Sequence, residues 1–415
     1  MIHNNSTTPD FDLIIIGAGP AGCTTALTLS DAGLKIALID KASLPASKIC
    51  GDALSGTVMN VLKRLPGNCY EEFLKVFPKT SSWGIRFISP GGKELDLPFI
   101  PGKNSTMPAP GYICQRKVFD GFLQKKVREL TGTLILDNFP VRHIIRENGT
   151  FIIKAEKGEL RCRMVVGADG IHSTAGRILA GHTLNHERYC LGARAYFRGV
   201  KDLHPEKFIE LHFLKDLLPG YFWIFPMEDG LVNAGLGIMY GKLKAGQASL
   251  TAKLHEVITS YPALSGRFDR AEMISRIEAH GLPMGPDPKS ISGEGFLLTG
   301  DAASLVDPFS GEGIGNAMVS GEIAGKVISE AFKSNDFSES FMKKYDERIR
   351  QRLSRELGTS RIVQKLITVP GLFDLVVKKA GRNKEFKEML TKMYTDQDVR
   401  DQLKNPGFYL KILLA

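Results

Sequence analysis

The chain has 415 residues, of which 43% are hydrophobic and 24% are charged, and it carries a formal net charge of +9. This is the composition of a globular protein long enough for two or three domains, and it excludes a disordered or fibrous chain. Lysine and arginine are spread along the chain instead of clustered, so we do not expect binding to nucleic acid.

The six cysteines include no C-x-x-C pair, which argues against a zinc site, an iron–sulfur cluster or a disulfide framework. We therefore predict no metal site. The first ten residues are polar, and no apolar run reaches the roughly 18 residues that a membrane span needs. These features predict a cytoplasmic protein whose contact with a membrane is at most peripheral.

The first predicted unit is strand–helix–strand. Residues 11–16 are apolar, residues 20–32 have a helical pattern, and residues 35–40 form a second apolar run. Between strand and helix lies Gly17-Ala18-Gly19-Pro20-Ala21-Gly22, a G-x-G-x-x-G motif, and Asp40 ends the second strand. This arrangement is typical of a dinucleotide-binding fold.

Each residue of this motif has a physical role in dinucleotide binding. Gly17 permits the tight turn, and Gly19 lets the backbone approach a pyrophosphate at the helix N-terminus. Gly22 allows close packing of the helix on the strand, and Asp40 is expected to hold the hydroxyls of a ribose. A glycine-rich turn without a nucleotide is the alternative, but strand, helix and acid stand in the order that binding requires.

Further along the chain, helical and strand-like segments alternate. Residues 83–99 alternate in polarity and contain Pro90-Gly91-Gly92, which predicts a hairpin, and residues 116–130 predict a helix. Further strands are expected within 134–166, 187–240 and 295–299, a long helix at 312–333, and mostly helix in the last 80 residues.

The order of these elements predicts an α/β fold built from separated pieces. We expect a Rossmann-type nucleotide-binding domain, an inserted antiparallel-sheet domain that binds substrate, and a helical C-terminal region. Their predicted limits are residues 1–82, 105–185 and 286–335 for the first, 83–104 and 186–285 for the second, and 336–415 for the third.

Two later strands end in glycine and aspartate. Asp169 and Gly170 end one of them, and Gly300 and Asp301 end the other. Ligands bind at the carboxyl ends of strands in open α/β sheets, so both carboxylates are expected to meet a cofactor. Residues 307–315 are rich in glycine and precede a helix, whose N-terminus would stabilise a reduced, anionic flavin. Local turns and caps are the alternative for each motif alone.

Residues 221–226 have the sequence Tyr-Phe-Trp-Ile-Phe-Pro. Alternation along a strand places Tyr221, Trp223 and Phe225 on one face. Such a face is a good wall for an apolar chain or a flat ring. Packing of the sheet on its own core is the alternative.

Together these motifs resemble a known superfamily. The Gly17–Gly22 turn and the two glycine–aspartate strand ends resemble the single-Rossmann FAD superfamily of para-hydroxybenzoate hydroxylase. Within it, the chain resembles the geranylgeranyl reductase family, and the resemblance covers roughly residues 10–335. Three segments carry the narrower match: Lys48–Asp52, Arg116–Asp120, and Tyr221–Pro226 followed after eight residues by Gly235-Leu236-Gly237.

The resemblance implies FAD as the cofactor, with the Cys-Gly-Asp segment beside the flavin and Arg116 facing FAD. Combined with the motifs above, it gives two sets of expected site residues. The cofactor set is Gly17, Gly19, Pro20, Ala21, Gly22, Asp40, Lys41, Cys50, Gly51, Arg116, Asp169, Gly170, Gly300, Asp301, Pro308, Gly311, Gly313 and Ile314. The substrate set is Tyr221, Trp223, Phe225, Pro226, Gly235 and Gly237.

The resemblance also implies a reaction, the saturation of a C=C bond in the polyprenyl chain of a lipid, quinone or pigment. Reduced flavin would deliver a hydride to one carbon, and a proton must reach the other. Cys50 is the expected catalytic proton source, and a small buried cysteine without a chemical role is the alternative. NAD(P)H is the expected transient electron donor, because no second nucleotide-binding motif is visible.

Other functions share this scaffold. A flavin-dependent hydroxylase or halogenase would consume oxygen. Halogenases of this type carry Trp-x-Trp-x-Ile-Pro, and Tyr221 and Phe225 depart from that element, which disfavours halogenation but not hydroxylation. An electron-carrying flavoprotein that feeds quinones would carry a four-cysteine cluster, and the cysteine spacing does not provide one. The sequence indicates no oligomeric state.

The mixed leucine and lysine segments 362–380 and 407–415 are too short to span a bilayer. They predict peripheral, salt-sensitive attachment to an anionic membrane surface. A basic helix that covers the protein's own core is the alternative.

Overall fold

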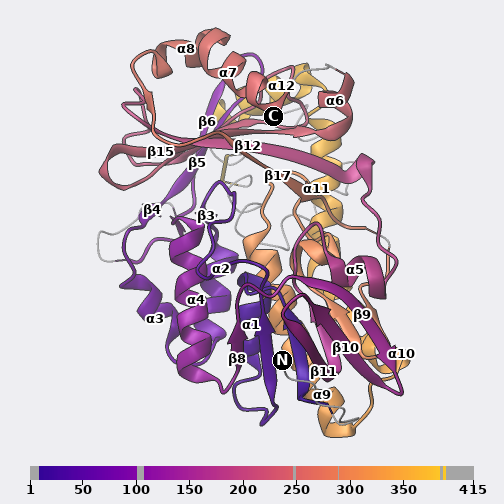
Figure 1. Ribbon diagram of the computed structural model, residues 1–415. Coiled ribbons are helices and arrows are strands. Elements are labelled where there is room, and N and C mark those ends of the chain that lie inside the picture. The colour runs from indigo at the N-terminus through magenta and orange to yellow at the C-terminus, as the bar shows by residue number, and fades with distance from the viewer. Residues whose placement is uncertain (1–8, 101–106, 246–248, 288, 384–386, 389–415) are drawn as a thin grey trace.

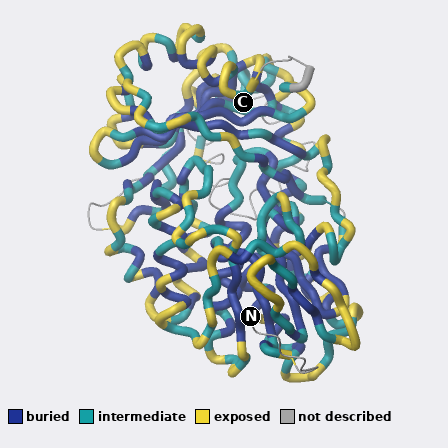
Figure 2. Tube along the Cα trace, in the orientation of Figure 1, coloured by how far each residue is buried: buried dark blue, intermediate teal, exposed yellow. Residues whose placement is uncertain are grey.

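The computed structural model describes residues 9–100, 107–245, 249–287, 289–383 and 387–388. Two large sheets dominate it, one at the bottom of Figure 1 near the N-terminus and one at the top. Helices cover both sheets, and buried strands form the centre of each layer (Figure 2).

The lower sheet is the nucleotide-binding sheet that the sequence predicts. Its central strand β1 (Phe11–Ile16) pairs in parallel with β2 (Ile36–Ile39) and β11 (Gly158–Gly167). Nearly every residue of β1 and β2 is buried, as expected for a parallel sheet covered on both faces. The sheet is completed by β8 (Leu134–Leu136), β19 (Phe296–Leu298), β18 (Ser292–Gly293), and the hairpin of β9 (Val141–Glu147) and β10 (Thr150–Ala155).

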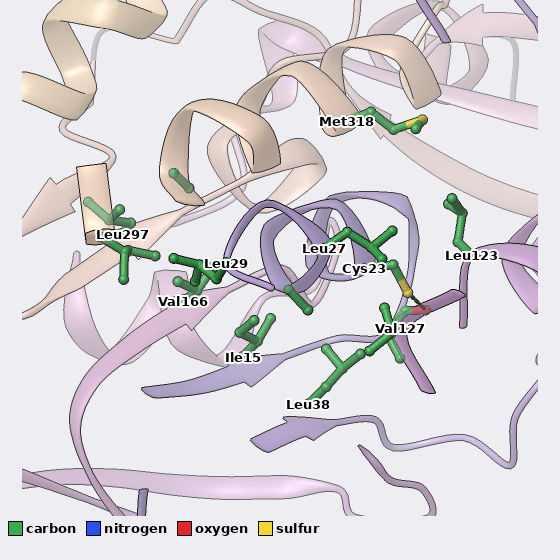
Figure 3. Packing of buried hydrophobic residues seen from close by; sticks show 14 of the residues in the cluster. Ile15, Cys23, Leu27, Leu29, Leu38, Leu123, Val127, Val166, Leu297 and Met318 are labelled. Carbon is green, nitrogen blue, oxygen red and sulfur yellow. Dashed lines mark hydrogen bonds between the residues drawn. The ribbon is translucent and has the colours of Figure 1, made fainter. Parts of the chain in front are cut away.

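Three helices share the core of this half: α1 (Pro20–Thr28) packs on β1 and β2, and it contacts both α4 (Arg116–Leu130) and α9 (Ile314–Ser334). Figure 3 shows part of the shared core, with Leu27 of α1 and Val127 of α4 near the strands. Helix α1 ends earlier than the predicted 20–32. The residues that follow it form tight turns, in which a backbone N–H donates to the carbonyl oxygen three residues earlier.

The upper sheet is mainly antiparallel. Its centre is β12 (Tyr189–Arg198), β15 (Leu231–Met239) and β14 (Phe222–Pro226). The predicted hairpin consists of β5 (Gly84–Ile88) and β6 (Glu94–Pro98). It joins this sheet through β5, which pairs in parallel with a strand from a distant part of the chain. The remaining strands are β13 (Ile209–His212), β16 (Glu272–Met273) and β17 (Glu278–Pro283).

The two faces of β14 pack against different partners. Phe222 and Ile224 belong to a core with α7 (Leu250–Ser260) and α8 (Pro262–Phe268), which lie above the sheet in Figure 1. Trp223 and Phe225 belong to a separate cluster on the opposite, inner face. The predicted alternation is confirmed, and the aromatic face looks toward the lower half of the molecule.

Between the two large sheets lies a small one of three strands, β3 (Ala53–Leu54), β7 (Gly111–Ile113) and β4 (Thr80–Ser82). The other helices are α2 (Gly56–Arg64), α3 (Cys69–Leu74), α5 (Thr174–Leu179) and α6 (Tyr240–Ala245), with 3-10 turns at His186–Arg188, Glu228–Gly230 and Gly300–Ala303.

The described C-terminal helices divide between the two large sheets. Met342 and Tyr345 of α10 (Glu339–Ile349) lie in the lower core, whereas Val377 of α12 (Pro370–Arg382) lies in the upper one. A π-helical turn (Arg350–Ser354) and α11 (Arg355–Leu366) connect them. Segment 407–415 lies outside the described residues. No helix in the described part of the chain is long and apolar enough to cross a membrane.

Candidate active site

The glycine-rich turn contains two glycines that the protein itself requires and one that it does not. Gly17 has a φ of +109°, and a Cβ there would lie 2.2 Å from the carbonyl oxygen of Ala168. A Cβ on Gly22 would lie 1.9 Å from the carbonyl oxygen of Gly17. A Cβ on Gly19 would meet nothing within 4 Å, and no side chain caps the N-terminus of α1. Open space and uncapped N–H groups at the same point fit a bound phosphate.

Asp40 braces this turn. Its carboxylate accepts hydrogen bonds from the backbone N–H of Ala18 (2.8 Å) and of Ala42 (2.9 Å). A carboxylate has about four acceptor positions, so two stay free for the hydroxyls of a ribose. Lys41 next to it is exposed. Binding of the ribose by Asp40 stays a prediction.

Asp169 has a local role in the structure. Its carboxylate accepts hydrogen bonds from the N–H groups of Thr174 (2.7 Å) and Ala175 (3.1 Å) at the start of α5. Gly170 has a φ of +79° and forms the turn between strand and helix. This is the capping alternative that the sequence left open, and a direct contact of Asp169 with the cofactor stays a prediction.

A cavity of about 1490 Å³ lies between the glycine-rich turn and the inner face of the upper sheet. It brings together most of the predicted residues from the middle and end of the chain. On its wall are Pro20, Cys50, Gly51, Arg116, Asp301, Pro308, Gly311, Gly313, Ile314, Tyr221, Trp223, Phe225 and Gly237. The predicted residues off its wall are Gly17, Gly19, Ala21, Gly22, Asp40, Lys41, Asp169, Gly170, Gly300, Pro226 and Gly235.

One end of the cavity is charged. The carboxylate of Asp301 accepts a hydrogen bond from the Lys48 ammonium at 3.0 Å. Burial is the largest single effect and raises the pKa of Asp301, but the charge and the hydrogen bond of Lys48, together with other nearby positive groups, outweigh it and leave the pKa below its usual range. Asp301 is therefore ionised at neutral pH. The buried guanidinium of Arg116 forms a two-bond ion pair with Asp120, at 2.8 and 2.6 Å.

His280 of β17 is a site residue that the sequence reasoning missed. It lines the cavity, and its Nε2 is buried without a hydrogen-bond partner among the described residues. Burial, and then the charge of Lys48, lowers the pKa of His280 to about 4, so the imidazole is neutral at pH 7. A lone histidine in a strand gives no signal in sequence, because only the topology brings it to this wall.

The loop before α9 is rigidly built. The carboxylate of Asp307 accepts hydrogen bonds from the N–H of Phe309 (2.9 Å) and of Ser310 (2.8 Å). The Tyr221 hydroxyl donates to the carbonyl of Ser310, which joins this loop to the substrate strand. Gly311 has a φ of +71°, and no side chain caps α9 at Gly313. The uncapped helix start on the cavity wall fits an anionic group, and stabilisation of a reduced flavin there stays a prediction.

The other end of the cavity is apolar. Trp223 and Phe225 face it, and Phe373 and Val376 of α12 lie on its far wall. Gly235 makes room for the indole, because a Cβ there would lie 2.5 Å from a ring carbon of Trp223. Helix α12, for which the sequence predicts membrane contact or, as the alternative, cover of the protein's own core, therefore helps to enclose the predicted substrate slot.

Cys50 lies where the charged end of the cavity meets the apolar end. The other five cysteines are buried, whereas Cys50 is half-buried and lines the cavity. Burial is the largest effect on its thiol and raises the pKa, so Cys50 keeps its proton at neutral pH. Beside it, a Cβ on Gly51 would lie 2.8 Å from the ring of Phe225. The Cys-Gly-Asp segment and the aromatic strand are thus in direct contact.

Comparison with known proteins agrees with this geometry. A family model described as FAD dependent oxidoreductase matches residues 12–68. A digeranylgeranylglycerophospholipid reductase of Methanopyrus kandleri is 31% identical over 349 residues, which cover 82% of each chain. A reductase of the same name from Methanococcus vannielii is 30% identical, over 86% of this chain and 87% of that one.

The chain belongs to the geranylgeranyl reductase family. It is therefore an FAD-dependent oxidoreductase, and the predicted cofactor and enzyme class are confirmed. Among solved structures, a geranylgeranyl bacteriochlorophyll reductase-like protein of Thermoplasma acidophilum matches with a TM-score of 0.77 and 23% identity over 97% of both chains. A flavin-dependent brominase matches with a TM-score of 0.76 and 20% identity, over 97% of this chain and 99% of that one, which shows a shared fold.

Proposed function

We propose that the protein saturates C=C bonds in the polyprenyl chains of a membrane lipid. The observation that carries this proposal is the single cavity in which an apolar slot, walled by Trp223 and Phe225, meets Cys50 and the loops that fit FAD. The names of the relatives, which are reductases of digeranylgeranyl glycerophospholipids, support the same substrate class.

The protein's own residues have three tasks in this reaction. FAD, when bound and reduced, supplies the hydride. The first task is to hold FAD, which would fall to the Gly17–Gly22 turn, Asp301 and the Gly311–Ile314 segment. The aromatic slot orients the alkene and excludes water, so that the reacting carbons stay in place. The third task is to supply a proton, because an isolated alkene is a poor hydride acceptor.

Cys50 is the proposed proton donor. Its Sγ keeps a proton at neutral pH and lies on the cavity wall between the charged and apolar ends. In this reaction the alkene would gain the hydride at one carbon and the thiol proton at the other. The resulting thiolate would then be reprotonated from solvent. We propose NAD(P)H as a transient external electron donor.

The test is an anaerobic assay. The FAD-loaded protein is incubated with a digeranylgeranyl glycerophospholipid and NADPH or dithionite, and lipids are followed by mass spectrometry. We expect products heavier by two hydrogens for each bond reduced. In a parallel assay with oxygen, a product that carries a new hydroxyl and forms only there would overturn the proposal in favour of a monooxygenase.

Replacing the thiol tests the role of Cys50. Cys50→Ala should retain FAD and slow product formation by about 10²–10⁴-fold, the usual value of a positioned proton donor. Cys69→Ala is the matched control, because Cys69 is buried in α3 and is absent from the cavity wall. Equal rates for both variants would leave the reaction in place and remove Cys50 from it.

A further inference from the structure

Asn233 lies at the junction between the cofactor loop and the substrate strand. It is a residue of β15 with no exposed surface. Its Nδ2 donates to the carbonyl oxygen of Cys50 (2.9 Å) and to the carboxylate of Asp52 (2.8 Å). Its Oδ1 accepts from the indole N–H of Trp223 (2.9 Å). One amide therefore contacts the proposed proton donor's backbone and the wall of the substrate slot.

The physical chemistry of a buried amide makes this arrangement specific. An amide buried without partners costs several kcal/mol, whereas both N–H bonds and the oxygen of Asn233 have partners. The donors and the acceptor also differ in kind, so the amide can take only one orientation. Asn233 faces Phe225 across the β14–β15 pair, which directs its side chain to the inner face.

Asp52 needs this support. It has a φ of +66°, a conformation that non-glycine residues rarely adopt, and it is almost fully buried. Its carboxylate also accepts from the Tyr196 hydroxyl (2.6 Å) and from the backbone N–H of Arg116 (3.2 Å). Side chains of the upper sheet thus hold the backbone of the Cys50–Asp52 segment in an unusual shape.

We propose that Asn233 is a positioning residue, which fixes the Cys50 thiol relative to the Trp223 ring. Its catalytic consequence rests on the proposed function, because it presumes that Cys50 supplies the proton. The claim that Asn233 fixes the position of Cys50 does not depend on the proposed function. The backbone carbonyl of Cys50 and the indole of Trp223 are both hydrogen-bonded to the Asn233 side chain. A shift of one of them therefore shifts the other.

The substitution Asn233→Asp tests this contact by charge. The variant keeps the size of the side chain but places a second carboxylate beside Asp52. Two carboxylates at this distance cannot both ionise, so the pKa of one is raised. Above that pKa the pair repels, and as the pH falls through it one carboxyl takes a proton and again donates a hydrogen bond. The other titratable groups facing Asp52 are Tyr196 and Arg194 of β12, Arg116 of α4, Cys50 and Cys114.

We expect Asn233→Asp to lower turnover by about 10- to 100-fold at pH 8, as a misplaced catalytic group does, and to recover most of it near pH 5.5. Wild-type protein assayed at each pH gives the reference. Tyr196→Phe removes one hydrogen bond to Asp52 and leaves the bonds of Asn233 to Cys50 and Trp223 in place, so it should cost less and show no such recovery. A pH-independent loss in Asn233→Asp would overturn the proposal.

A second readout does not depend on the reaction. Cys50 is the only one of the six cysteines that is not buried, so a small alkylating agent should modify it first. We expect Asn233→Asp to be alkylated several-fold faster than wild type at pH 8.5. At low pH the ratio of the two rates should fall to about one. A ratio of one throughout means that Asn233 does not hold Cys50. Wild-type protein without reductase activity, but with the expected ratio, would refute the proposed function alone.

Discussion

At the scale of single residues, the glycines of the nucleotide turn separate folding from binding. Gly17 and Gly22 have the carbonyl oxygens of Ala168 and Gly17 where a side chain would stand, so the protein's own packing demands them. Gly19 has only open space there. The need for glycine at this position therefore comes from what binds, and the difference can be measured.

We predict that Gly19→Val folds but does not retain FAD. The valine side chain would occupy the space in which the pyrophosphate approaches the backbone. Flavin content after denaturation and the melting temperature, compared with wild-type apoprotein, test this. Gly22→Val is the contrast, because its Cβ clashes with backbone at 1.9 Å and should prevent folding. A yellow, FAD-loaded Gly19→Val would contradict the assignment of the turn.

At the scale of elements, β14 shows how far a pattern in sequence can go. Strict alternation places Phe222 and Trp223 on opposite faces, and the structure confirms this. The pattern could not say which face meets the cavity, because both faces are apolar and buried. That choice depends on α7 and α8 covering one face and on the cofactor loop meeting the other.

Site residues divide along the same line. Motifs with fixed spacing, such as Gly17–Gly22 and Gly311–Gly313, were predictable because their glycines lie close together in the sequence, at or directly before the start of a helix. Asn233 and His280 were not, since each lies in a strand with no recognisable motif around it. Asn233 bonds to Cys50 and Asp52 across 183 and 181 positions of the chain, and only the fold brings these residues together. Capping by Asp169 was weighed in the sequence, and the structure supplied the contacts.

The two faces of β14 give an internal control for substrate binding. Trp223→Ala should lower turnover by about 10- to 100-fold and raise KM, because the alkene loses a wall that orients it. Phe222→Leu, on the α7 side, should lower the melting temperature and leave turnover per folded molecule near wild type. Steady-state kinetics on FAD-loaded protein, with thermal melts, distinguish the two. Similar kinetic losses in both variants would mean that Trp223 acts through stability.

At the scale of the whole molecule, the fold brings the two sheets together around one cavity, and the C-terminal helices close it. Helix α10 packs on the lower core, and α12 packs on the upper one, so the C-terminal part ties the halves together. If the protein acts on a membrane lipid, as proposed, that lipid must reach the apolar slot from a bilayer. We propose that α11 and α12 meet the membrane, because Val369 between them is 54% exposed and Ile362 is 38% exposed.

This proposal predicts salt-sensitive flotation with liposomes. Lys365 lies on α11 with Ile362, and Lys378 lies on α12, which begins directly after Val369, so binding should combine apolar contact with attraction to anionic headgroups. The protein should float with phosphatidylglycerol vesicles at low salt and release at high salt, where charges are screened. Val369→Glu should weaken flotation by removing apolar area and adding a repelled charge. Phe77→Ser is the control, since Phe77 is 72% exposed but follows α3 and should not matter. Flotation that is absent at low salt, or equally reduced by both variants, would rule out these helices as the contact surface.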